Sequence, residues 1–195
     1  MRRIKGILNA SDKLDPTPAL VVIDLQKGIV AAPTAHPIAE VLGRTAELGR
    51  AFRQRKFPVV PVHVTWRPSG RTDAGPPKMS LPPDWAEFVP ELEQSADEFV
   101  VEKQCPGAFL GSNLDQYLRG RSVTRIVLCG VSTSVGVEST ARSAFDLGYN
   151  VVLPVDAVTD RDADNHRHSI EEIFPRLAET CEAKEVLSLL VKSVR

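Results

Sequence analysis

The 195-residue chain has few cysteines, no long hydrophobic run and no excess of charge of either sign. Its three cysteines are an odd number without Cys-x-x-Cys spacing, which argues against a disulfide framework and is typical of the reducing cytoplasm. No stretch is apolar for long enough to span a membrane, and no signal-peptide run follows the basic start Met-Arg-Arg-Ile-Lys. We therefore expect a cytoplasmic protein without a membrane partner.

The charge balance also limits the partners of the chain. With 24 basic and 25 acidic residues, it offers no field that would attract nucleic acid or another polyanion. No glycine-rich phosphate-binding fingerprint follows the first apolar run, so we expect no nucleotide cofactor. The length suits one core without internal repeats, and we expect a single domain over residues 1–195.

Short apolar runs alternate with helical patterns along the chain, which predicts an α/β fold with three α/β/α layers. The runs are β-branched and almost continuously apolar, as strands of a parallel sheet buried on both faces should be. We predict a six-stranded, mainly parallel sheet, with a weak sixth strand. The expected strands are residues 19–24, 59–64, 98–102, 125–129, 150–155 and 180–182.

Helical spacing of apolar residues marks the segments between these strands. The clearest stripe is Val41, Thr45, Leu48 and Phe52, and shorter patterns cover residues 114–118 and 170–177. Pro175 should kink or end the late helix, because proline lacks the N–H that a helix needs.

Residues 65–97 interrupt this rhythm with six prolines and little periodicity. A loop of this length in a compact domain is usually a lid, a binding loop or a subunit contact.

Residues 128–145 are the most informative stretch of the sequence. An apolar strand ends there, Gly130 allows a tight turn, and apolar residues then recur at helical spacing from Val137 to Phe145. In parallel α/β sheets, ligands bind at the carboxyl ends of strands, where such turns face the first amides of a helix. The stretch therefore predicts a substrate site.

Two charged residues end other predicted strands. Asp24 follows the apolar run 20–23, where it is either a buried functional carboxylate of raised pKa or a cap for the turn at Gln26 and Lys27. Lys103 follows residues 99–102, where it is either solvated or paired with Asp24 at the same edge of the sheet.

Four segments carry a family resemblance. G-V-S-T-S-V-G-V-E-S-T-A (130–141) resembles the G-V-x-T-x-x-C-V-x-x-T-A signature of isochorismatase-like hydrolases, also called the cysteine hydrolase family. V-V-I-D-L-Q-K-G (21–28), V-E-K-Q-C-P-G-A-F (101–109) and H-S-I-E-E-I-F-P-R-L (168–177) match further segments of that family. The resemblance implies a Rossmann-like fold and a homodimer or higher homo-oligomer.

The same resemblance implies the roles of individual residues. The Asp and Lys of the family's Asp–Lys–Cys triad correspond to Asp24 and Lys103, and a cis peptide is expected at Val131–Ser132. The candidates for substrate binding or for the cis-peptide turn are Gln26, Trp66, Arg67, Phe109, Val131 and Ser132.

One departure from the family pattern decides the expected chemistry, because Gly136 stands where the family has its nucleophilic cysteine. Glycine cannot form the covalent intermediate of an amidase, which excludes the family's usual route of amide hydrolysis. Cys105 is a minor candidate for a replacement thiol. Related nicotinamidases bind a metal through an Asp and two His, but the residues after His63 lack that spacing, so we expect no metal.

True isochorismatases resemble this chain in having glycine at that position, and they cleave a vinyl ether, which requires an acid. The resemblance thus predicts hydrolysis of a small, isochorismate-like carboxylate, with Asp24 as the acid and Lys103 orienting it and the substrate carboxylates. The residues around Gly136 are more similar to the cysteine amidases. Two alternatives therefore stay open: a catalytically disabled relative, or a Cys-to-Gly variant of a carbon–nitrogen hydrolase.

Overall fold

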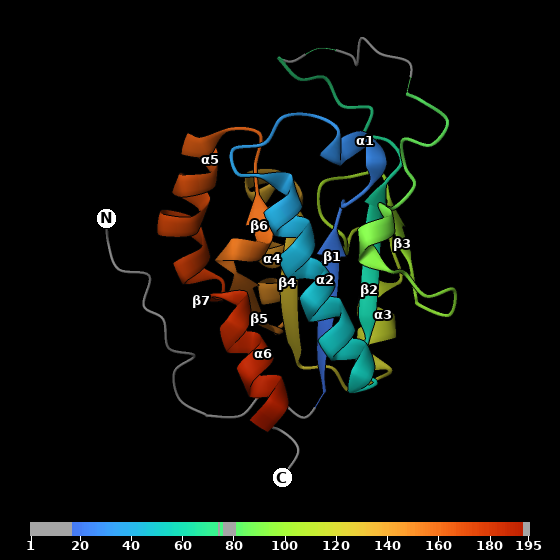
Figure 1. Cartoon of the computed structure of the whole chain (residues 1–195). Coiled ribbons are helices and arrows are strands. Elements are labelled where there is room, and N and C mark those ends of the chain that lie inside the picture. Colours follow the sequence, from blue (N-terminus) through green and yellow to red (C-terminus); the bar gives the residue numbers. More distant parts are fainter. Residues whose placement is uncertain (1–16, 74, 76–80, 193–195) are drawn as a thin grey trace.

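A seven-stranded parallel sheet forms the centre of the computed structural model, which describes residues 17–73, 75 and 81–192 (Figure 1). The strand order is β3-β2-β1-β4-β5-β7, with β6 paired to β4, and every pairing between strands is parallel. The strands are β1 (Pro18–Ile23), β2 (Val59–Val64), β3 (Val101–Lys103), β4 (Arg125–Val131), β5 (Asn150–Pro154), β6 (Val158–Thr159) and β7 (Glu179–Cys181).

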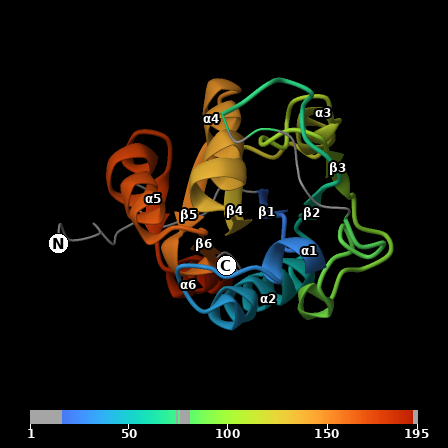
Figure 2. The ribbon, with the colours of Figure 1, turned by 90° about the horizontal axis from the view of Figure 1, so that it is seen from above.

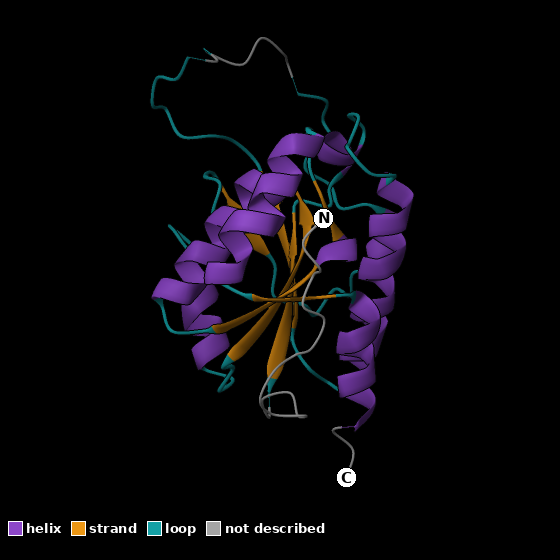
Figure 3. Cartoon of the chain, turned by 90° about the vertical axis from the view of Figure 1, so that its left-hand side faces the viewer, coloured by secondary structure: helices purple, strands orange, loops and turns teal. Residues whose placement is uncertain are grey.

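Helices cover both faces of this sheet. One face carries α2 and α6, and the other carries α3 and α4, as the views from above and from the side show (Figures 2 and 3). The helices are α1 (Lys27–Val30), α2 (Ile38–Gln54), α3 (Leu114–Arg119), α4 (Glu138–Asp146), α5 (Ala163–His168) and α6 (Ala183–Lys192). The three-layer α/β/α prediction with a mainly parallel sheet is confirmed.

Alternation along β1 explains why its sequence is continuously apolar. Successive side chains of a strand point to opposite faces of the sheet. Leu20 and Val22 therefore pack in the core under α2 and α6, whereas Val21 and Ile23 pack in the core under α3 and α4. Because both faces are covered, no position of β1 between Ala19 and Ile23 can be polar without cost.

Several predicted boundaries differ from the structure. The prediction of six strands was wrong by one, because β6 has only two residues and therefore no readable alternation. The third strand begins at Val101 rather than at residue 98, since Glu98 closes a turn on the carbonyl of Ser95. The late helix is a regular α-helix only to His168. A π-helical turn follows over Ser169–Ile173, and Pro175 lies in the short 3₁₀ turn after it, Phe174–Arg176.

Gly130 lies inside β4 and not in a tight turn, which corrects the expectation from the sequence. It has a φ of 121° and is paired with Ile23 across the β1–β4 ladder. A Cβ at this position would overlap the carbonyl oxygen of Ile23, so the close approach of the two strands requires glycine.

The strand order makes the carboxyl ends of β1 and β4 a switch point of the fold. From β1 the chain first adds β2 and β3 on one side, and then returns to add β4 and β5 on the other. Crevices of parallel α/β sheets open at such points, and ligands bind there. The expected ligand site is therefore above Ile23 and Val131.

Among the described residues, no helix is both long enough and apolar enough to cross a membrane. The cytoplasmic location, the single-domain organisation and the homo-oligomer stay predictions.

Candidate active site

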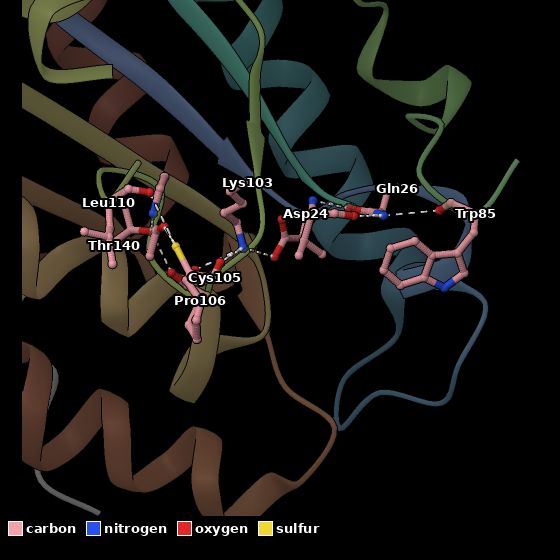
Figure 4. Close-up of polar contacts among 12 residues, drawn as sticks. Asp24, Gln26, Trp85, Lys103, Cys105, Pro106, Leu110 and Thr140 are labelled. Carbon is pink, nitrogen blue, oxygen red and sulfur yellow. Dashed lines mark hydrogen bonds and ion pairs between the residues drawn. The ribbon is translucent and has the colours of Figure 1, made fainter. Parts of the chain in front are cut away.

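Asp24 and Lys103 form a buried ion pair at the carboxyl edge of the sheet (Figure 4). Asp24 follows β1 with a φ of 51°, a conformation that Asp tolerates better than most residues. Lys103 ends β3, two strands away. Its Nζ lies 2.8 Å from Asp24 Oδ2, and the two side chains are 1% and 8% exposed. Asp24 is therefore not a plain turn cap and Lys103 is not solvated; the two side chains form an ion pair.

The ammonium group of Lys103 has no hydrogen bond left to offer a ligand. Besides the bond to Asp24, Nζ donates to the carbonyl oxygens of Cys105 at 3.2 Å and Pro106 at 3.0 Å. An ammonium has three N–H donors, and all three are used. Lys103 can therefore hold Asp24 in place, whereas a direct bond to a substrate carboxylate would require one of these three bonds to break.

The second oxygen of the Asp24 carboxyl group is available for a proton. Oδ1 is buried and has no hydrogen-bond partner among the described residues. Burial raises the pKa of Asp24 from 3.8 to about 6, although the charge and hydrogen bond of Lys103 and the charge of His63 lower it. Because Lys103 occupies Oδ2, the proton belongs on Oδ1. The group can therefore act as an acid near neutral pH.

Asp24 and Lys103 line a pocket of ≈ 240 Å³. Its walls are mostly apolar, and two arginines supply the remaining charge, Arg67 after β2 and Arg161 after β6. The other lining residues are Ile29, Val64, Trp66, Pro68, Cys105, Pro106, Val131, Ser132, Val135 and Gly136. This composition suits a small molecule with an apolar body and an anionic group.

Gly136 packs directly on the ion pair. It lies in the helical turn Thr133–Val137, which follows a cis peptide at Val131–Ser132 and leads into α4. A Cβ at position 136 would come within 2.9 Å of Ile23 Cγ2 and 3.1 Å of Asp24 Oδ2. A side chain at this position would therefore require Ile23 and the Asp24 carboxylate to shift.

Most of the residues expected at the site meet in this pocket: Asp24, Lys103, Gly136, Trp66, Arg67, Val131 and Ser132. Gln26 and Phe109 do not line it, which corrects their expected position. The Gln26 side chain bonds to the backbone of Val64, which lines the pocket, and to the carbonyl of Trp85, which does not, so it joins the pocket wall to the Trp85 segment (Figure 4). The Phe109 ring packs beside Tyr149, with ring centroids 5.9 Å apart.

Arg161 was missed in the sequence. Its guanidinium donates to the carbonyl oxygens of Ile29 at 2.6 Å and Pro33 at 3.2 Å, which fixes the side chain at the wall of the pocket. Arg161 could have been identified only from its position just after the strand Val158–Thr159, and a strand of two residues is too short to be recognised from its sequence pattern.

The cysteines and histidines take other roles. Cys105 lines the pocket, but its thiol donates to the carbonyl oxygens of Gly107 and Leu110. Cys129 is in the core, where burial raises the pKa of its thiol to about 12. The His63 Nδ1 lies 2.8 Å from the carbonyl oxygen of Ala86. Within the described part of the chain, no three His, Cys, Asp or Glu side chains gather as metal ligands would.

Comparison with known proteins finds a matching family model and several similar proteins. The family model described as the isochorismatase domain matches residues 18–185. The "Uncharacterized isochorismatase family protein YecD" of Escherichia coli O157:H7 is 40% identical over 181 residues, covering 89% of this chain and 96% of that protein. Streptothricin hydrolase of Streptomyces noursei is 35% identical over 142 residues, which are 71% of this chain and 48% of that protein.

A solved structure has the same fold. The isochorismatase family protein from Burkholderia thailandensis superposes with a TM-score of 0.87 and 42% identity, covering 92% of this chain and 98% of that chain.

Proposed function

The chain belongs to the isochorismatase family of hydrolases, and on that premise we propose that it cleaves the vinyl ether of a small carboxylate, as in isochorismate, by proton transfer from Asp24. The carrying observation is that Asp24, whose Oδ1 is buried without a hydrogen-bond partner among the described residues, lines the pocket in which glycine occupies position 136. Such a site contains an acid and no side-chain nucleophile at that position.

The reaction consists of a proton transfer from Asp24, an addition of water and the breakdown of the resulting hemiketal. Asp24 transfers the proton on Oδ1 to the terminal carbon of the enol ether, which leaves an oxocarbenium ion at the neighbouring carbon. Water adds to that carbon and loses a proton, and the resulting hemiketal breaks its C–O bond to release an alcohol and a keto acid. For isochorismate the keto acid is pyruvate. Lys103 stabilises the Asp24 carboxylate that the first step creates, because its Nζ is already bonded to Oδ2.

The pocket supports a carboxylate substrate through its arginines. The hydrogen bonds of Lys103 are all used inside the protein, so Arg161 and Arg67 are the cations that can meet a substrate carboxylate. Apolar walls, Trp66 and Val135 among them, enclose the rest of the substrate and lower the dielectric around the acid.

Replacement of Arg161 tests whether this residue binds the substrate carboxylate. Arg161→Ala is expected to raise KM about tenfold while kcat changes by less than about threefold, because the substrate loses a charged partner away from the acid. Arg167→Ala is the matched control, since Arg167 is exposed on α5 and pairs with Asp164 instead of lining the pocket. An unchanged KM for Arg161→Ala in steady-state kinetics would remove Arg161 from substrate binding.

The pH dependence of the rate separates an acid from a base or nucleophile. Asp24 acts only when protonated, so kcat/KM is expected to fall as the pH rises through its pKa of about 6. The decrease should approach about tenfold per pH unit above that value. Initial rates measured from about pH 5 to about pH 8 would show it. A rate that instead rises over this range would require a deprotonated catalytic group and contradict the proposal.

Direct assay decides between the candidate functions. We expect the wild-type protein to release pyruvate from isochorismate and no ammonia from primary amides of small carboxylic acids. Ammonia release without pyruvate release would indicate a carbon–nitrogen hydrolase and overturn the proposal. Turnover of neither substrate class would favour a disabled relative. The close contacts around Gly136 favour the first outcome, because a side chain at this position would require Ile23 and the Asp24 carboxylate to shift.

A further inference from the structure

Asp160 is a buried carboxylate that lies next to the pocket without lining it. It follows β6, the strand that the sequence pattern did not reveal, and is only 3% exposed. Burial of a charged group is costly unless hydrogen bonds compensate for the lost water. Its partners therefore show which arrangement the carboxylate stabilises.

Both carboxylate oxygens of Asp160 accept hydrogen bonds. Oδ2 accepts the backbone N–H of Ser134 at 2.7 Å and the Ser134 hydroxyl at 2.8 Å, and Oδ1 accepts the backbone N–H of Arg161 at 2.7 Å. The carbonyl oxygen of Asp160 also accepts the N–H of Ala35 at 2.8 Å. One residue thus joins the turn before α4, the residue after β6 and the loop between α1 and α2.

Two of these three segments contribute directly to the pocket wall: the turn supplies Gly136, and Arg161 supplies a cation. The third, the loop that contains Ala35, follows α1, and α1 supplies Ile29 to the wall. Arg161 in turn donates to the carbonyls of Ile29 and Pro33. It thereby contacts the same part of the chain that Asp160 binds through Ala35. In the view from above, the loop between α1 and α2 passes beside β6 (Figure 2).

We propose that Asp160 is a positioning residue, which holds Arg161 and the turn at Ser134 in the geometry that binds the substrate carboxylate. The kinetic part of this inference rests on the proposed function. A carboxylate is needed because the three groups that face its side chain are all donors. An amide in its place would turn an NH₂ toward one of them.

A neighbouring residue provides the matched control. Asp162 also accepts a backbone N–H, from Asn165 at 2.9 Å, but it is exposed and serves only as the cap of α5. Asp160→Asn is expected to raise KM about tenfold and to leave kcat within about twofold, because Asp24 and Lys103 make no bond to Asp160. Asp162→Asn should leave KM unchanged. A purely structural role would instead lower the active fraction at constant KM.

A double-mutant cycle tests whether Asp160 acts through Arg161. In an Arg161→Ala background, Asp160→Asn should add less than about twofold to KM, because the positioned group is already absent. Full additivity of the two effects would overturn the proposed coupling. If Asp160→Asn does not fold, Ser134→Ala takes its place: it removes one donor and should raise KM in the same direction by a smaller factor.

Hydrogen exchange gives a readout that does not depend on turnover. Asp160→Asn should speed exchange of the Ser134 and Arg161 amides and leave β1 and β3 protected, whereas Asp162→Asn should affect only the start of α5. If the wild-type protein does not cleave isochorismate but this exchange pattern appears, the proposed function fails and the positioning role stands. Unchanged exchange at Ser134, or loss of protection throughout the sheet, would overturn the role of Asp160.

Discussion

Asp24→Asn is expected to abolish vinyl-ether cleavage and to leave the fold intact. The amide has no acidic proton to transfer to the enol ether, so the rate of pyruvate release should fall by the contribution of a general acid, about 10²–10⁴-fold. Asparagine has nearly the same shape, and its oxygen can still accept the bond from Lys103 Nζ that Asp24 Oδ2 accepts. Single-turnover assays and circular dichroism measure the two effects.

Stability should decrease moderately in the same variant. Complete removal of one partner from a buried ion pair costs about 3–5 kcal/mol, and Asn avoids part of that loss by keeping the hydrogen bond. Asp84→Asn is the control, because Asp84 pairs with Lys27 at the surface, with an Nζ–Oδ2 distance of 3.2 Å and both side chains exposed. If Asp24→Asn kept more than about a tenth of the wild-type rate, Asp24 would not be the acid.

Gly136→Cys is expected to lower stability and vinyl-ether cleavage without creating an amidase or esterase. The new Cβ would lie 2.9 Å from the Cγ2 of Ile23, a fully buried β-branched residue that cannot move aside easily. It would also lie 3.1 Å from Asp24 Oδ2, so the carboxylate would have to shift by a few tenths of an ångström from its place beside Lys103. Overpacking of this kind costs about 1–3 kcal/mol. Thermal unfolding and pyruvate release measure the loss.

Comparison of Gly136→Ala with Gly136→Cys separates the effect of the added Cβ from the reactivity of the thiol. Both variants should lose stability to a similar degree, because both carry the Cβ that contacts Ile23. Neither should release ammonia from small primary amides or show a burst with p-nitrophenyl acetate. A burst in the cysteine variant, with alanine tolerated as well as glycine, would mean that the site still accommodates a thiol. The chain would then be a cysteine hydrolase that has lost its nucleophile.

The sequence by itself determined the layers of the fold and two strand ends at the site. Continuous, β-branched apolar runs such as residues 19–23 are typical of strands covered on both faces, and parallel strands place their carboxyl ends at one edge. Pairing of Asp24 with Lys103 was therefore one of the two alternatives that the sequence left open, and the family resemblance favoured it, although 79 positions separate the two residues. The stripe from Val41 to Phe52 likewise identified α2, because helical periodicity is a local property of the sequence.

Only the tertiary structure decided how these groups work. The three N–H donors of Lys103 are all used only because the carbonyls of Cys105 and Pro106 lie beside them. The space for a side chain at Gly136 is limited by Ile23, which lies in β1. Arg161 and Asp160 follow a strand of two residues, too short for any period. Their roles depend on contacts between segments far apart in the chain, and local sequence patterns do not encode which backbone groups meet across such distances.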